Sequence, residues 1–96
     1  MKFMCTWMVH EDKREDVLKV WCPLSPEERG DAGPGVTIIG RWHNLVEMTG
    51  VAIVEAESAA ALSAYLLKWN PYMDMDIAPV LDDEESAAVG KAALGI

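Results

Sequence analysis

The chain has 96 residues, of which 51% are hydrophobic and 25% are charged. This is the mixture of an ordinary globular domain, and it excludes intrinsic disorder and fibrous repeats. The formal net charge of −8 argues against nucleic acid and against an anionic membrane as partners, because both require clustered Lys and Arg. We therefore expect one domain over residues 1–96, with a thin core.

The expected compartment is the cytoplasm. The first apolar run, residues 3–9, is shorter than a secretory signal requires, and charged residues follow it at once. No stretch approaches the roughly 20 apolar residues of a membrane helix. Cys5 and Cys22 are isolated in the sequence, so two buried, reduced thiols are expected rather than a disulfide or a reactive thiol.

The first half of the chain predicts a strand, a helix, a loop and a second strand. Residues 2–9 contain Phe, Trp and Val, which favour a strand. Residues 11–22 predict a helix, which Pro23 ends. Residues 23–35 hold three prolines and three glycines, which predicts a long mobile loop that would act as a lid over a pocket. Residues 36–43 begin with β-branched residues and predict the second strand.

The second half predicts two more strands and two more helices. The strands are expected over 50–56 and 72–80, and the first helix over 59–70. Pro79 suits an edge strand, because proline cannot donate to a ladder. A capping box of Asp82 and Glu85 opens a terminal helix. The stripe of the 59–70 helix consists of Leu62, Tyr65, Leu66 and Trp69.

This order, β-α-β-β-α-β with a terminal helix, is that of a ferredoxin-like α+β fold. Right-handed crossovers place both helices on one face of an antiparallel sheet with the spatial strand order 4-1-3-2. Side chains alternate along each strand, so the strands divide into two faces. The helix face is expected to hold Phe3, Cys5, Trp7, Val9, Val36, Ile38, Trp42, Met73, Met75 and Ile77. The other face is expected to hold Met4, Thr6, Met8, Thr37, Ile39, Arg41, His43, Asp74 and Asp76.

The second face mixes methionines and Ile39 with charged residues. A lone subunit would expose this apolar surface to water, and contiguous patches of that kind usually mark an interface. The sequence therefore predicts a homodimer in which two sheets pack face to face.

Four segments resemble an uncharacterised family of small bacterial proteins in the dimeric α+β-barrel superfamily. They are Lys-Phe-Met-Cys-Thr-Trp at 2–7, Gly-Arg-Trp-His at 40–43, Val-Ala-Ile-Val-Glu-Ala at 51–56 and Pro-Val-Leu-Asp-Asp-Glu-Glu at 79–85. The superfamily includes antibiotic-biosynthesis monooxygenases, haem-degrading monooxygenases, muconolactone isomerases and non-enzymatic ligand-binding modules. The resemblance implies a ferredoxin-like subunit and a sheet-to-sheet dimer. It implies no single reaction, because fold does not fix function.

Four charged residues on the second face form the first candidate site. If Arg41 and His43 converge with Asp74 and Asp76, within or across the dimer, Arg41 would bind a small anion and His43 would move a proton. Mutual repulsion would raise the pKa of one of the two aspartates. The structural alternative is an interfacial ion pair between Arg41 and an aspartate that sets the dimer register.

Aromatic residues form the second candidate. Trp7, Trp21, Trp42 and Trp69 would wall an apolar pocket between sheet and helices, or would simply be the core of a small protein. The ligand-binding candidates are Arg41, His43, Trp42, Trp7 and Thr6. Gly40 predicts a bulge or room for an approaching ring. No cofactor is expected, and no metal, because His10, His43 and the aspartates lack ligand spacing.

Three functions are consistent with these patterns. The first is a protein that binds an unidentified small molecule. The second is a cofactor-independent monooxygenase or isomerase that acts on an aromatic or enol-like small molecule. The third is a non-enzymatic structural or regulatory interaction module.

Overall fold

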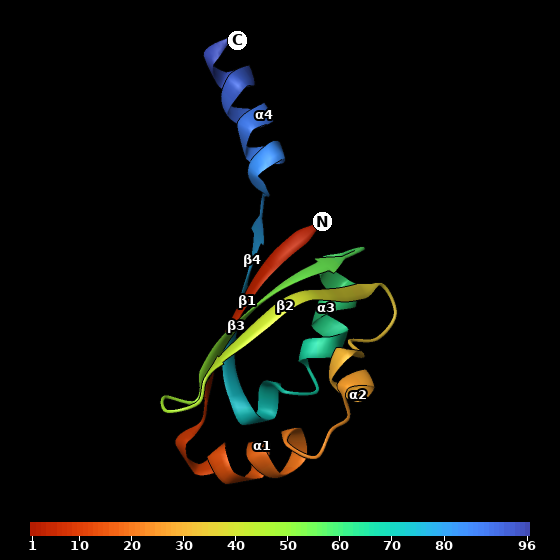
Figure 1. Ribbon diagram of the computed structural model, residues 1–96, viewed down its shortest axis with the longest axis vertical. Coiled ribbons are helices and arrows are strands. Elements are labelled where there is room, and N and C mark those ends of the chain that lie inside the picture. Colours follow the sequence, from red (N-terminus) through yellow and green to blue (C-terminus); the bar gives the residue numbers. More distant parts are fainter.

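The computed structural model describes residues 1–96 and contains a four-stranded antiparallel sheet with helices (Figure 1). The strands are β1 (Lys2–Val9), β2 (Val36–Asn44), β3 (Thr49–Ala56) and β4 (Met73–Val80). They lie in the order β2-β3-β1-β4, which is the expected order 4-1-3-2 counted from the other edge. The predicted α+β, ferredoxin-like arrangement is confirmed.

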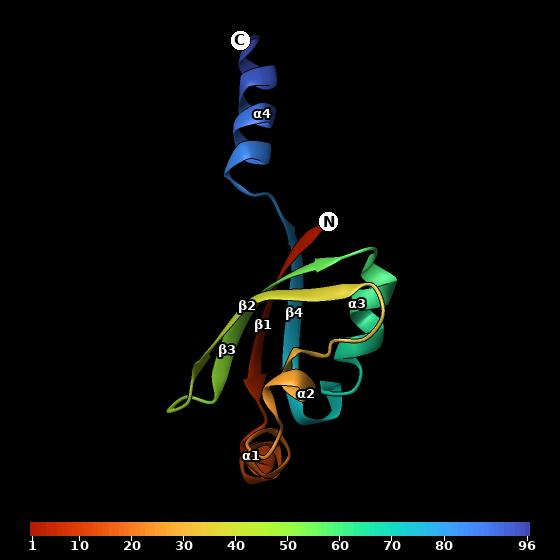
Figure 2. The same cartoon turned by 45° about the vertical axis from the view of Figure 1, so that its right-hand side comes forward.

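The four helices leave one side of this sheet uncovered. They are α1 (Arg14–Trp21), α2 (Pro26–Gly30), α3 (Ala59–Leu66) and α4 (Asp83–Leu94), with 3-10 turns at Glu11–Lys13 and Asn70–Tyr72. Figure 2 shows α2 and α3 on one side of the sheet, α1 near one end, and no helix on the other side. We call the uncovered side the open face. No helix is long and apolar enough to cross a lipid bilayer.

Helix α2 lies in the segment that was expected to be a loop. The Ser25 hydroxyl accepts a hydrogen bond from the Glu28 N–H (3.1 Å), and the Glu28 carboxylate accepts one from the Ser25 N–H (3.0 Å). These reciprocal bonds form a capping box, and Pro26 occupies the first turn, where its missing N–H is harmless. The prediction of a loop over residues 23–35 was wrong, because it gave the prolines and glycines more weight than the capping box of Ser25 and Glu28.

The core lies between the sheet and the helices. Phe3 and Cys5 from β1 and Val54 from β3 are buried beneath Leu62 of α3, which is completely inaccessible. A second cluster joins α1 to the other end of the sheet, where Val17 is buried. Burial on one face of each strand follows from alternation, so β1 has the helix-side residues that the sequence predicts.

Strand β2 contains a β-bulge. Ile38 pairs with Val54 of β3, but Gly40, two residues later, pairs with Ile53, one residue earlier in β3. Ile39 is therefore an extra residue in the ladder. An extra residue on one strand reverses the faces of all the residues beyond it.

The bulge corrects the predicted faces at the end of β2. Arg41 and His43 point to the helix side and line a pocket there, whereas they were expected on the open face. Trp42, expected on the helix side, is 62% exposed and lies on the open face. Its ring covers Gly40, because a Cβ at Gly40 would overlap the indole. Gly40 therefore meets both expectations: it adjoins the bulge, and its lack of a side chain leaves room for the Trp42 ring.

The open face carries exposed apolar side chains and is acidic at one edge. Its exposed apolar side chains include Met8 at 57%, Ile39 at 57% and Trp42 at 62%. On the edge strand β4, Asp74 lies on this face, and its carboxylate is 3.0 Å from Nε2 of His10. The structure thus exposes apolar side chains from β1 and β2 on the side of the sheet that no helix covers.

Helix α4 extends away from the sheet (Figure 1), and all of its residues are exposed. Asp82 and Glu85 form the predicted capping box at its start. The Lys2 ammonium lies 3.4 Å from a carboxylate oxygen of each of these residues and 3.6 Å from one of Glu55. This ion-pair cluster connects the base of α4 to β1.

Candidate functional site

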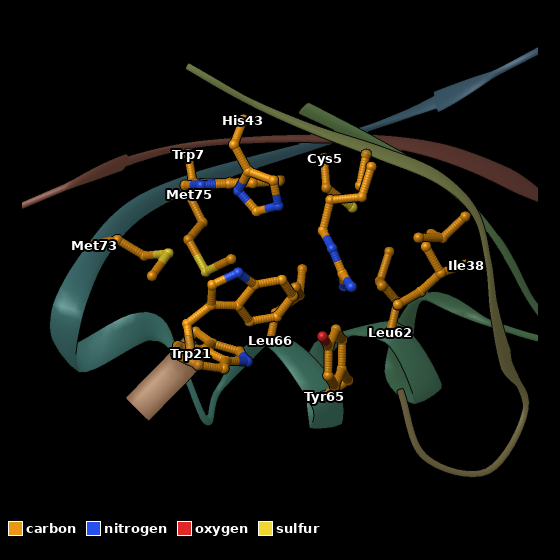
Figure 3. Close-up of a pocket in the computed structure, with 14 residues that line it drawn as sticks. Cys5, Trp7, Trp21, Ile38, His43, Leu62, Tyr65, Leu66, Met73 and Met75 are labelled. Atoms are coloured by element: carbon orange, nitrogen blue, oxygen red, sulfur yellow. The ribbon is translucent and has the colours of Figure 1, made fainter. Parts of the chain in front are cut away.

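A pocket lies between the sheet and the helices, and twelve of its fourteen lining residues are hydrophobic. The sheet contributes Cys5, Trp7, Ile38, Arg41, His43, Ala52, Val54, Met73 and Met75, and the helical side contributes Trp21, Leu62, Tyr65, Leu66 and Trp69. We call these fourteen residues the indole pocket. Figure 3 shows His43, Cys5 and Met75 on the sheet side, facing Trp21, Leu66 and Tyr65. The cavity measures about 70 Å³, where a single water needs roughly 10–15 Å³.

Aromatic rings line both the sheet side and the helical side of the indole pocket. The ring centres of Trp21 and Trp69 are 6.2 Å apart at an interplanar angle of 71°. The imidazole of His43 lies 5.3 Å from the Trp21 ring and 5.8 Å from the Trp7 ring. These edge-to-face and tilted arrangements are the ones that aromatic quadrupoles favour. They hold flat surfaces around the cavity, and three of the four tryptophans contribute to them.

Arg41 is the only Lys or Arg that lines the pocket. Its guanidinium carbon lies 4.3 Å from the centre of the Trp21 ring, a cation–π geometry. Its Nη2 donates a hydrogen bond to the Arg29 carbonyl oxygen at the end of α2 (2.9 Å). None of the ion pairs in the protein involves Arg41. Its positive charge is therefore held by a ring and a carbonyl, without a carboxylate.

Burial governs the ionisation of the groups in the pocket. It lowers the pKa of Arg41, and the Tyr65 hydroxyl partly opposes that shift. Arginine nevertheless stays charged in proteins. Burial also lowers the pKa of His43, and the charge of Arg41 lowers it further. The imidazole is consequently neutral at pH 7, with one N–H donor and one acceptor nitrogen.

The two cysteines differ in their surroundings. Cys5 is buried in the pocket wall, and burial raises the pKa of its thiol, so the sulfur stays protonated and behaves as an apolar surface. Cys22 is exposed after α1, contrary to the expectation that both thiols are buried. Both cysteines are free.

The structure brings together three of the seven predicted site residues, Arg41, His43 and Trp7. The other four, Thr6, Trp42, Asp74 and Asp76, lie on the open face. Thr6 pairs directly with Asp76 across β1 and β4. The sheet therefore separates the two aspartates from the arginine and histidine, and the expected convergence of these four residues within one chain is wrong.

Two polar groups at the pocket were not anticipated. Tyr65 belongs to the predicted stripe of α3, but the stripe predicted only its burial and not its hydroxyl near a guanidinium. Arg29 contributes through its backbone carbonyl, which carries no side-chain signal. Its position depends on α2, and only the capping box at Ser25 points to that helix.

Comparison with known proteins supplies a family and similar solved structures. Residues 1–94 match the family described as a domain of unknown function (DUF3303). Among solved structures, Rv0793 from Mycobacterium tuberculosis shares 12% sequence identity at a TM-score of 0.45. That alignment covers 85% of this chain and 95% of that chain. No curated protein matches the chain. The family description names no activity, so the function has to be argued from the pocket.

Proposed function

The chain belongs to the DUF3303 family of unknown function, and we propose that it binds a small organic molecule in the indole pocket. One observation carries this proposal: an apolar, aromatic-walled cavity into which Arg41 and His43 bring hydrogen-bonding nitrogens. Ligand sites are commonly concave, mainly apolar, and furnished with a few polar groups that orient the ligand.

The space inside the pocket favours binding over a purely structural role. Protein cores are packed as densely as organic crystals, with few voids larger than a water. Here Trp21 and Trp69 border a cavity of about 70 Å³, several times the space that one water needs. That space, open to solvent on one side, is available to a small molecule.

A cofactor-independent monooxygenase or isomerase is the second candidate function. It is favoured by the neutral imidazole of His43, whose pKa is lowered by burial and then by Arg41. A neutral imidazole can accept a proton from an aromatic or enol-like molecule, and a nearby guanidinium stabilises the anion that results. Under this alternative, His43 is the base and Arg41 the electrostatic partner.

The proposed assembly is a homodimer in which two open faces pack together, as in the dimeric α+β-barrel superfamily. It is supported by the exposure of Met8, Ile39 and Trp42 on one uncovered face. Light scattering should give twice the subunit mass, and Ile39→Asp should shift the protein to a monomer. A wild-type chain that is monomeric at working concentration would contradict the assembly without affecting the pocket.

A thermal-shift screen against aromatic acids, quinones and haem tests the function. A ligand that binds only the folded state raises Tm as its concentration increases. Trp21→Ala, which removes a pocket wall, should abolish the shift. Trp42→Ala, its matched control on the open face, should preserve it. If no compound raises Tm, or if both variants respond alike, the indole pocket is not a binding site and an interaction module becomes the better account.

A further inference from the structure

The Arg41 guanidinium carries a positive charge that the protein does not neutralise. The chain has 16 acidic residues and a net charge of −8, yet none of its ion pairs includes Arg41. Arg41 is only partly exposed and lies among apolar residues. Removing a charge from water without a counter-charge is unfavourable. An anion bound beside the Arg41 guanidinium would supply the missing counter-charge and offset this cost.

We propose that the indole pocket takes a small planar carboxylic acid, aromatic or unsaturated, whose carboxylate pairs with Arg41 and whose flat body lies against the indoles. This inference rests on the proposed function and names its ligand class. The planar fork of a guanidinium matches the two oxygens of a carboxylate. Trp21 and Trp69 offer flat apolar surfaces to a ring.

The existing contacts of Arg41 prepare it for this role. Its single hydrogen bond to the Arg29 carbonyl and its contact with Trp21 fix the position of the guanidinium. Arginine has five N–H donors, so most of them stay available to a ligand. A group already held in place loses little further freedom when the ligand arrives, which favours affinity. Neutral His43 can donate its N–H to a polar substituent of the same ligand.

The lining distinguishes a carboxylate with an apolar body from a simple inorganic anion. Twelve of the fourteen lining residues are hydrophobic, and they cannot replace the water that surrounds phosphate. The cavity of about 70 Å³ has room for several waters, which the flat body of such a ligand would displace.

Titration with benzoate and with benzamide, its neutral analogue, tests the inference. Tryptophan fluorescence and Tm report binding. Wild-type protein should bind benzoate at least about tenfold more tightly than benzamide, the scale of one charge-assisted interaction. Arg41→Gln should remove this preference by weakening benzoate alone. Arg41→Lys should retain part of it, because the ammonium keeps the charge without the fork.

Arg14→Gln is the matched control, because Arg14 is exposed on α1 and outside the pocket. It should leave both affinities unchanged. If wild-type protein bound benzoate and benzamide equally well, the inference that Arg41 recognises a carboxylate would be overturned, but ligand binding in the pocket would not. If inorganic phosphate competed for the pocket as effectively as benzoate, the inference that the ligand has a planar apolar body would be overturned. Absence of binding by both probes and by every compound in the screen would overturn the proposed function itself. If Arg41→Gln does not fold, Arg41→Lys and the wild-type benzoate-to-benzamide ratio decide the question.

Discussion

The Arg41 guanidinium lies 4.3 Å from the centre of the Trp21 ring, although regular alternation along β2 places the two residues on opposite sides of the sheet. The bulge at Ile39 and Gly40 produces this contact, because one extra residue reverses the faces beyond it. Without the bulge, Arg41 would share the open face with Asp74. The chemistry of the pocket therefore depends on a local irregularity in one edge strand.

Gly50 should be intolerant of a side chain. It pairs with Trp7, and a Cβ at this position would overlap the Trp7 indole and lie 2.9 Å from the Trp42 carbonyl oxygen. Gly50→Ala should therefore destabilise the protein by about 1–3 kcal/mol, as overpacking does, and should displace Trp7 from the pocket wall. Urea unfolding measures the loss.

Gly90→Ala supplies the comparison for that substitution. Nothing lies within 4 Å of a Cβ at Gly90 in α4, and alanine favours a helix over glycine by about 1 kcal/mol. Its free energy of unfolding should be unchanged or higher. Equal destabilisation by both substitutions would mean that the close approach at Gly50 is not what matters.

The pH dependence of stability should carry a contribution from His43. Its pKa is lowered in the folded protein by burial and by Arg41, so the unfolded chain binds the proton more readily. This contribution to the free energy of unfolding is fully present above the ordinary imidazole pKa of about 6.5. It is lost as the pH falls through the lower pKa that His43 has in the folded protein. The free energy of unfolding of wild type, relative to His43→Gln, should decline on acidification. A relative gain at low pH would indicate a raised pKa instead.

The two thiols should react at very different rates with a thiol-specific reagent. Cys22 is exposed, whereas Cys5 is buried and its pKa is raised by burial. Native protein should label rapidly at one cysteine, and Cys22→Ser should remove that fast phase. In denaturant, both thiols should react together. Rapid labelling of both cysteines in the native protein would contradict this prediction and show that the pocket wall around Cys5 opens readily.

Deletion of residues 83–96 should leave the sheet folded. Every residue of α4 is exposed, and the helix is connected to β1 through the exposed ion pairs of Lys2, which are weak in water. Circular dichroism of the truncated chain should still show one cooperative transition with a similar Tm. Loss of that transition would assign α4 a structural role that its contacts do not indicate.

The sequence predicts the strand order and most of the elements, because these follow from local patterns. Residues 2–9 form β1 as expected, and Pro79 lies on an edge strand. The candidate site was predicted less well. Alternation assigns faces correctly only while pairing is regular, and whether Gly40 forms a bulge depends on its partner strand. The sequence offered Gly40 as a possible bulge, but it could not determine that Arg41 would turn inward.

Nuclear magnetic resonance of the Arg41 side chain tests most directly whether this residue points into the indole pocket. Protons close to an indole face experience its ring current, so those of Arg41 should be shifted upfield. Trp21→Leu should remove that shift, whereas Trp42→Leu, on the open face, should leave it in place. A shift that persists in Trp21→Leu and disappears in Trp42→Leu would place the guanidinium on the uncovered side of the sheet and contradict the site.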